Sequence, residues 1–134
     1  MTQLELKNHQ VWQDLITIVE NIDSNALAKE HLEACDYKVC GYWDEQDVFY
    51  EEVILPRTLE TQLLSSSIGF TGKERFLQLK FSLQTTLAAM VQLNPQIQKV
   101  GELVLIYDEN LEFLDERWLL DVDSPLLRMN VTEP

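Results

Sequence analysis

Apolar residues in the first part of the chain recur at the spacing of a helix. They stand mostly three, four or seven positions apart, with polar residues between them, at Leu4, Val11, Leu15, Ile18, Val19 and Ile22. Asp23 and Ser24 follow, and their side-chain oxygens can cap a second, shorter helix over residues 25–34. We therefore predict two N-terminal helices, arranged as a helical hairpin or as one kinked element.

Two segments rich in aromatic and β-branched residues come next, at residues 37–43 and 48–55. The link between them, residues 44–47, is short and polar, which is typical of a hairpin. Pro56 cannot donate a hydrogen bond to a sheet, so it marks the end of the second strand. The pattern in residues 57–71 is ambiguous: we expect a short helix over 58–64 and a surface loop at 65–69.

The clearest helical pattern lies in residues 71–93. Thr71 and Glu74 have the spacing of a capping box, and Asn94-Pro95 provides a stop. The apolar positions that follow are Phe76, Leu79, Leu83, Leu87, Met90 and Val91, widened by Leu77, Ala88 and Leu93. Because this stripe covers much of the girth, we predict a central helix.

The last third of the chain predicts a second hairpin. Residues 103–107 are continuously apolar, residues 108–110 supply a turn, and residues 111–114 return as a partner strand. Residues 118–120 either extend that strand after an irregularity or form another one. The expected fold is one α+β domain over residues 1–134, with the N-terminal helices and the central helix packed on an antiparallel sheet built from the two hairpins.

The strong acidity of the chain changes which partners are expected. It has 23 acidic and 10 basic residues, a formal charge of −13 and a pI near 4.3. Such a surface repels phosphate groups, which disfavours nucleic acids and anionic membranes, and it attracts basic proteins. The alternative explanation is that the charge only maintains solubility.

Most of the excess negative charge falls in the two predicted hairpins. Residues 36–55 hold six acids and one lysine, and residues 102–123 hold eight acids and one arginine. If both hairpins belong to one sheet, their turns and exposed faces form a single acidic surface. The candidate partner-binding residues are Asp44, Glu45, Asp47, Glu51, Glu52, Asp108, Glu109, Glu112, Asp115 and Glu116, with Trp43 and Tyr50 as aromatic anchors.

A metal site is not expected. His31, Cys35 and Cys40 have the loose spacing of a zinc half-site, but no further cysteine supplies a fourth ligand. We expect both cysteines to be free, buried thiols, which fits a reducing compartment. The first residues lack a signal-peptide pattern, and no apolar run is long enough to span a bilayer. These observations predict a cytoplasmic protein.

Catalytic motifs are also not apparent. Gly72-Lys73 at a predicted helix start has the look of a phosphate-binding loop, but Ser67 replaces the first glycine and Glu74 replaces the magnesium-binding hydroxyl residue. The three serines at 65–67 have no neighbouring base. The acidic turns lack the glycine of a calcium loop. We therefore expect no cofactor and no enzymatic activity.

A small, acidic, cytoplasmic α+β chain without catalytic motifs has the profile of an inhibitor of the bacterial immunity type. We expect it to neutralise a basic protein, such as a toxin nuclease domain, through its acidic surface. One alternative is a homodimeric secretion or assembly chaperone. A further alternative is an enzyme whose carboxylates assemble only in the folded chain.

Overall fold

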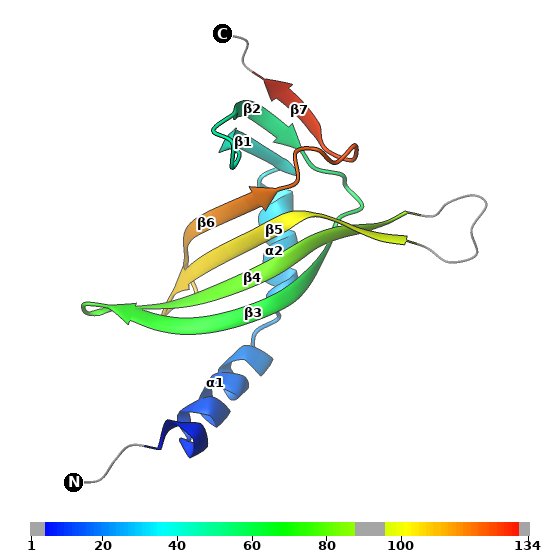
Figure 1. Cartoon of the computed structure of the whole chain (residues 1–134). Helices are drawn as coiled ribbons and strands as arrows, with labels where there is room; N and C mark the ends of the chain where they lie inside the picture. Colours follow the sequence, from blue (N-terminus) through cyan, green and yellow to red (C-terminus); the bar gives the residue numbers. More distant parts are fainter. Residues whose placement is uncertain (1–4, 88–95, 132–134) are drawn as a thin grey trace.

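A computed structural model of the chain describes residues 5–87 and 96–131. These residues form a mixed α+β protein with two antiparallel sheets (Figure 1). Sheet A has three strands and sheet B has four. The α+β class predicted from the sequence is confirmed, although the arrangement of its elements differs from the expected one.

The two N-terminal helices are present as predicted. A short 3-10 turn, η1 (Leu6–Asn8), precedes α1 (Val11–Glu20) and α2 (Ser24–Ala34). Asp23 caps α2, because its Oδ1 accepts a hydrogen bond of 3.1 Å from the Ala26 N–H. Among the described helices none is both long and apolar enough to cross a bilayer.

Sheet A contains the first predicted hairpin. Strands β1 (Lys38–Trp43) and β2 (Phe49–Ile54) pair antiparallel around the acidic turn. A strand that the sequence did not reveal, β7 (Arg128–Val131), pairs with the other side of β2. The chain therefore returns to its first sheet at its end.

Sheet B is a meander of four consecutive strands, β3 (Glu60–Thr71), β4 (Glu74–Leu87), β5 (Gln96–Asp108) and β6 (Phe113–Leu120). The second predicted hairpin is its β5–β6 pair, with a register shift after Ile106. The prediction that the two hairpins build one sheet is wrong, because β1–β2 and β5–β6 belong to different sheets.

The predicted central helix is also wrong. Residues 74–87 are the long strand β4, which pairs with β3 and β5, and residues 88–93 lie outside the described residues. Leu79, Leu83 and Leu87 are four apart, so they satisfy a helical spacing. However, the buried positions alternate with more exposed ones from Leu77 through Phe81, which is the period of a strand.

The segment expected to hold a short helix and a loop is strand β3. It pairs with β4 from Glu60 to Thr71, with one register shift between Leu63 and Ser65. Thr71 and Glu74 are therefore a cross-strand pair beside a two-residue loop, and not the capping box of a helix. The serines lowered the apparent strand propensity, and pairing with β4 overrides that local preference.

One face of sheet B, α2 and sheet A enclose the core. The largest fully buried side chains come from all three: Phe81, Leu32, Leu55, Leu79, Leu83, Leu103, Leu105, Val53 and Val100. The Tyr42 hydroxyl joins the two sheets, because it accepts a hydrogen bond of 2.9 Å from the Leu120 N–H. This link places the β1–β2 turn beside the end of β6.

Candidate functional site

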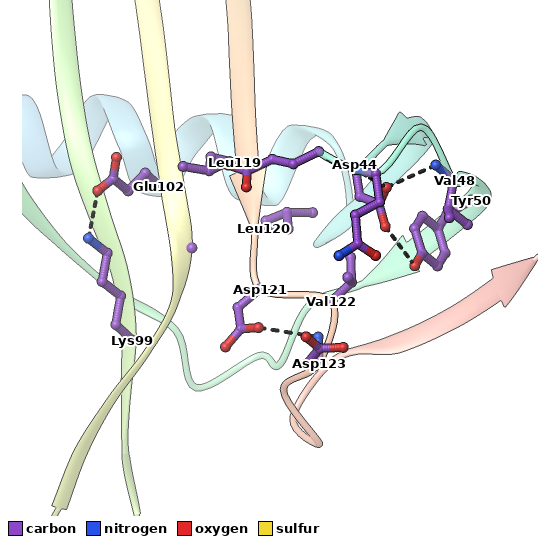
Figure 2. A pocket seen from close by; sticks show the side chains of 13 residues that line it. Asp44, Val48, Tyr50, Lys99, Glu102, Leu119, Leu120, Asp121, Val122 and Asp123 are labelled. Atoms are coloured by element: carbon purple, nitrogen blue, oxygen red, sulfur yellow. Dashed lines mark hydrogen bonds and ion pairs between the residues drawn. The ribbon is translucent and has the colours of Figure 1, made fainter.

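A hollow of about 450 Å³ lies at the junction of the two sheets (Figure 2). Three segments surround it: the β1–β2 turn, the middle of β5, and the chain that leaves β6. We call it the acidic hollow, and its lining residues are Asp44, Glu45, Gln46, Val48, Tyr50, Lys99, Gly101, Glu102, Leu119, Leu120, Asp121, Val122 and Asp123.

Close packing of β5 and β6 shapes the base of the hollow. Gly101 is buried in β5, and a Cβ atom at this position would meet the Leu119 carbonyl oxygen at 2.5 Å. Only glycine permits this approach of the two backbones. Beyond β6, the Asp121 N–H donates a hydrogen bond of 2.9 Å to the Val100 carbonyl, which turns the chain along the rim.

Asp44 builds the opposite wall from the β1–β2 turn. Its Oδ1 accepts hydrogen bonds of 2.9 Å from the N–H groups of Gln46 and Val48, and its Oδ2 accepts one of 3.1 Å from the Tyr50 hydroxyl. The Val48 N–H, followed by Gln46 N–H and the Tyr50 hydroxyl, holds the pKa of Asp44 below its ordinary value. Asp44 is therefore a fixed anion.

Glu102 is held by two lysines beside the hollow. Lys99 Nζ lies 2.6 Å and Lys80 Nζ lies 3.3 Å from its carboxylate oxygens. The hydrogen bond from Lys99, with that from Lys80, lowers the pKa of Glu102. Two lysines thus balance the negative charge of Glu102. In the described residues, these lysines form no ion pair with the other acids of the hollow.

The carboxylates on the rim are available to a partner. Five of the lining residues are acidic and one is a lysine, so the hollow has a net formal charge of −4. Glu45 and Asp123 are exposed, and in the described residues their side chains form no hydrogen bond or ion pair. Asp121 is exposed too, and its Oδ1 accepts a hydrogen bond of 3.2 Å from the Asp123 N–H. This arrangement suits a lysine or arginine side chain.

Apart from Asp44, Glu45 and Tyr50, the predicted residues of the first hairpin lie outside the hollow. Asp47 is in the same turn, at a φ of 60°, while Glu51 and Glu52 are on β2. Trp43 is 61% exposed and packs on the Phe49 ring with a centroid distance of 4.9 Å, so it can serve as an anchor. Tyr50 is buried and cannot, although its hydroxyl supports Asp44.

The acids of the second hairpin are at the other end of sheet B. Asp108 is six residues along β5 from Glu102, or about 20 Å at the rise of a strand. Its Oδ1 holds the β5–β6 turn through the N–H groups of Asn110 (2.8 Å) and Glu112 (2.9 Å). Glu109 lies 3.7 Å from Arg75 Nε. We call Asp108, Glu109 and Glu112 the distal acids.

Two predicted acids lie along β6. Asp115 is exposed, and its Oδ1 accepts a hydrogen bond of 2.8 Å from the Glu116 N–H. Glu116 points to α2, where it contacts His31. The acids therefore separate into the hollow, the distal acids and positions along β2 and β6. A single acidic surface was expected if both hairpins shared one sheet, and that premise is wrong.

The three residues of the possible zinc half-site have other surroundings. His31 contacts Glu116, and the Cys35 thiol donates to the Leu32 carbonyl at 3.3 Å. Burial raises the pKa of that thiol. Both cysteines are free, but Cys40 is exposed and Cys35 is only partly buried, so the prediction of two buried thiols is wrong. Across the described parts of the chain, no three potential ligands gather to hold a metal ion.

Sequence reasoning did not select Glu102, Asp121 or Asp123 as site residues. They entered only the count of acids in the second half of the chain. One signal in the sequence could have identified two of them as site residues, because Asp121 and Asp123 alternate with Val122 directly after an apolar strand. However, their position opposite Asp44 depends on the junction between the sheets, which the sequence pattern does not reveal.

Comparisons with protein-family models, curated proteins and solved structures find no significant match for this chain.

Proposed function

We propose that this chain is an inhibitor of the immunity type, which binds a basic protein partner through the acidic hollow. The observation that carries the proposal is the hollow itself, with five carboxylates, one lysine and a volume of about 450 Å³. A lysine or arginine side chain of the partner enters it and replaces water around the carboxylates. A toxin nuclease is a suitable partner, because its phosphate-binding site is basic.

Each group has a defined task in the proposed binding. Asp44 is already oriented by three hydrogen bonds, so little conformational freedom is lost when it accepts a cation. Glu45 and Asp123 extend the negative field to the rim. Leu119 lines the hollow and is 45% exposed, so its side chain provides apolar contact beside the charges.

The proposal is tested by charge reversal at two positions on the rim. The tagged protein is used to capture partners from its native lysate, and Glu45→Lys/Asp123→Lys is compared with the unmodified chain. We expect capture of a basic protein, released by added salt, and at least a tenfold loss of affinity in the double variant. Loss of two attractive charges and gain of two repulsive ones explains this loss.

The matched control is Glu109→Lys/Glu112→Lys, which makes the same charge change in the distal acids. It retains the affinity of the unmodified chain if the hollow is the binding site. Equal losses in both double variants would mean that only the net charge matters, and that outcome rejects the hollow. Binding retained in both would favour a chaperone that holds its partner through apolar surface.

A further inference from the structure

Strand β3 is an edge of sheet B that, beyond its first residue, lacks the charged residues and prolines that commonly prevent strand pairing. Within sheet B, β3 pairs with β4 on one side, and no described strand pairs with its other side. Residues 61–72 contain no charged residue and no proline, whereas β6, at the opposite edge, carries Asp115, Glu116 and Arg117 in succession. Charges and prolines are the common means of preventing edge pairing. The β3 edge is therefore open to another strand.

Helix α1 has an apolar surface without cover. None of its residues is buried, and Trp12, Ile16 and Ile18 are 48%, 49% and 44% exposed. A ten-residue helix is marginally stable in water unless its apolar face packs on something. In Figure 1, α1 lies beyond β3, outside the area of sheet B. A second surface must reach α1 at this place to bury it.

The two features are adjacent. Thr61 Oγ1 near the start of β3 lies 3.4 Å from Asn25 Oδ1 near the start of α2, so α1 leaves the body of the protein at this end of β3. Phe70 is at the other end of β3 and is 80% exposed. Phe70 and Ile68 belong to the face of sheet B that α2 covers, because Ile68 pairs with the buried Leu77.

We propose that β3 pairs antiparallel with β3 of a second copy, and that α1 of each copy packs on Phe70 and Ile68 of the other. Full overlap of Glu60–Thr71 with its copy places Thr61 of one chain opposite Phe70 of the other. The α1 helix therefore emerges beside the partner's exposed Phe70. Twofold symmetry repeats this contact, as expected for an isologous dimer.

Charge favours a second copy over a basic partner at this edge. Two chains of −13 repel each other over most of their surfaces. Residues 61–72 add no charge, so copies that meet here repel each other less than copies that meet at the acidic segments. A basic protein would gain more electrostatically at those acidic segments than at this uncharged edge. The pairing leaves the acidic hollow open, because the hollow involves β5 and β6, and the inference does not depend on what the hollow binds.

Sedimentation equilibrium at about 100 µM tests the dimer, a concentration at which a dissociation constant near 1 µM corresponds to a mostly dimeric sample. We expect twice the chain mass of 15.6 kDa. The Ser65→Lys/Ser67→Lys variant places like charges at the centre of the proposed strand pair and should be monomeric. Its control, Gln84→Lys/Thr86→Lys, adds the same charge on the interior strand β4 and should remain dimeric.

The packing of α1 is tested separately by Phe70→Gln. We expect at least tenfold weaker self-association, while Ile97→Gln, which alters an exposed apolar residue of β5, leaves it unchanged. Circular dichroism confirms that each variant is folded. A monomeric wild-type chain, or a dimer unaffected by the two lysines on β3, would overturn the strand pairing. A dimer unaffected by Phe70→Gln would overturn the packing of α1.

Discussion

Asp44 and Asp108 perform the same task in two different turns. Each accepts hydrogen bonds from the N–H groups two and four residues later, at 2.8 to 2.9 Å. This is the local bonding that makes aspartate a favoured turn residue. Two of the acids that charge alone marked for partner binding are therefore also required for the shape of their turns. The acids without such bonds, such as Glu45 and Asp123, are better positions for testing recognition.

The Glu102 carboxylate leads to a prediction about how the stability of the fold depends on pH. Its folded-state pKa is lowered by Lys99 and Lys80, so its contribution to stability is present above the ordinary pKa of 4.5. That contribution is lost as the pH falls through the lower folded-state pKa. Glu102→Gln should therefore lower the free energy of unfolding by about 0.5–1 kcal/mol near pH 7. The difference from wild type should disappear at pH values below the lowered folded-state pKa of Glu102.

Urea denaturation at several pH values measures this difference. Glu112→Gln removes the same charge where no lysine lies in contact, and we expect it to have little effect at any of these pH values. A constant effect of Glu102→Gln between neutral and acidic pH would show that the ion pairs do not stabilise the fold.

Strand β4 and its turn illustrate how one pattern can predict two elements. Thr71 and Glu74 have the spacing of a capping box, yet they also flank a two-residue hairpin loop. The loop residue Gly72 has a φ of +61°, a conformation that favours glycine. The positive φ of Gly72 therefore distinguishes a hairpin loop from the start of a helix.

Gly72→Ala tests directly whether this segment is a hairpin loop or the start of a helix. In the hairpin, alanine at a positive φ should cost about 1 kcal/mol of unfolding free energy, whereas in the first turn of a helix it would be stabilising by a similar amount. Chemical denaturation measures whether the substitution lowers or raises the free energy of unfolding. Lys73→Ala, at the next loop position, serves as the control and is expected to be nearly neutral. A stabilised Gly72→Ala protein would contradict the hairpin.

At the scale of the whole molecule, the two proposed surfaces lie on different parts of sheet B. The acidic hollow belongs to β5, β6 and the β1–β2 turn, and the proposed dimer belongs to β3. Three strand spacings separate β3 from β6, or about 15 Å. We therefore expect partner binding and self-association to be energetically independent.

The monomeric Ser65→Lys/Ser67→Lys variant provides the measurement of this independence. Its affinity for the captured partner should stay within about threefold of wild type, since sites this far apart without shared contacts usually act additively. The reciprocal experiment uses Glu45→Lys/Asp123→Lys, which should sediment as a dimer. A large loss of partner affinity in the monomer would place the dimer interface within the binding site.

Local signals predicted the elements whose residues have one dominant period or a clear turn. The cap at Asp23, the polar turn at 44–47 and the apolar run at 103–107 all lie in the expected elements. The failures concern β3 and β4, where serine and glutamine are strand residues because neighbouring strands satisfy their backbone groups. Strand β7 is four residues long and has no pattern that distinguishes it from a loop.

By itself, the sequence determined the acidity of this protein, its α+β class, its N-terminal helices and its two hairpin turns, because these depend on composition and on contacts between near neighbours. Only the tertiary structure decided that the hairpins lie in separate sheets and that β4 is a strand. It also decided that Asp44, Glu102 and Asp121 share one hollow. Strand partners are chosen by burial and by hydrogen bonds between distant segments, and no local pattern encodes them.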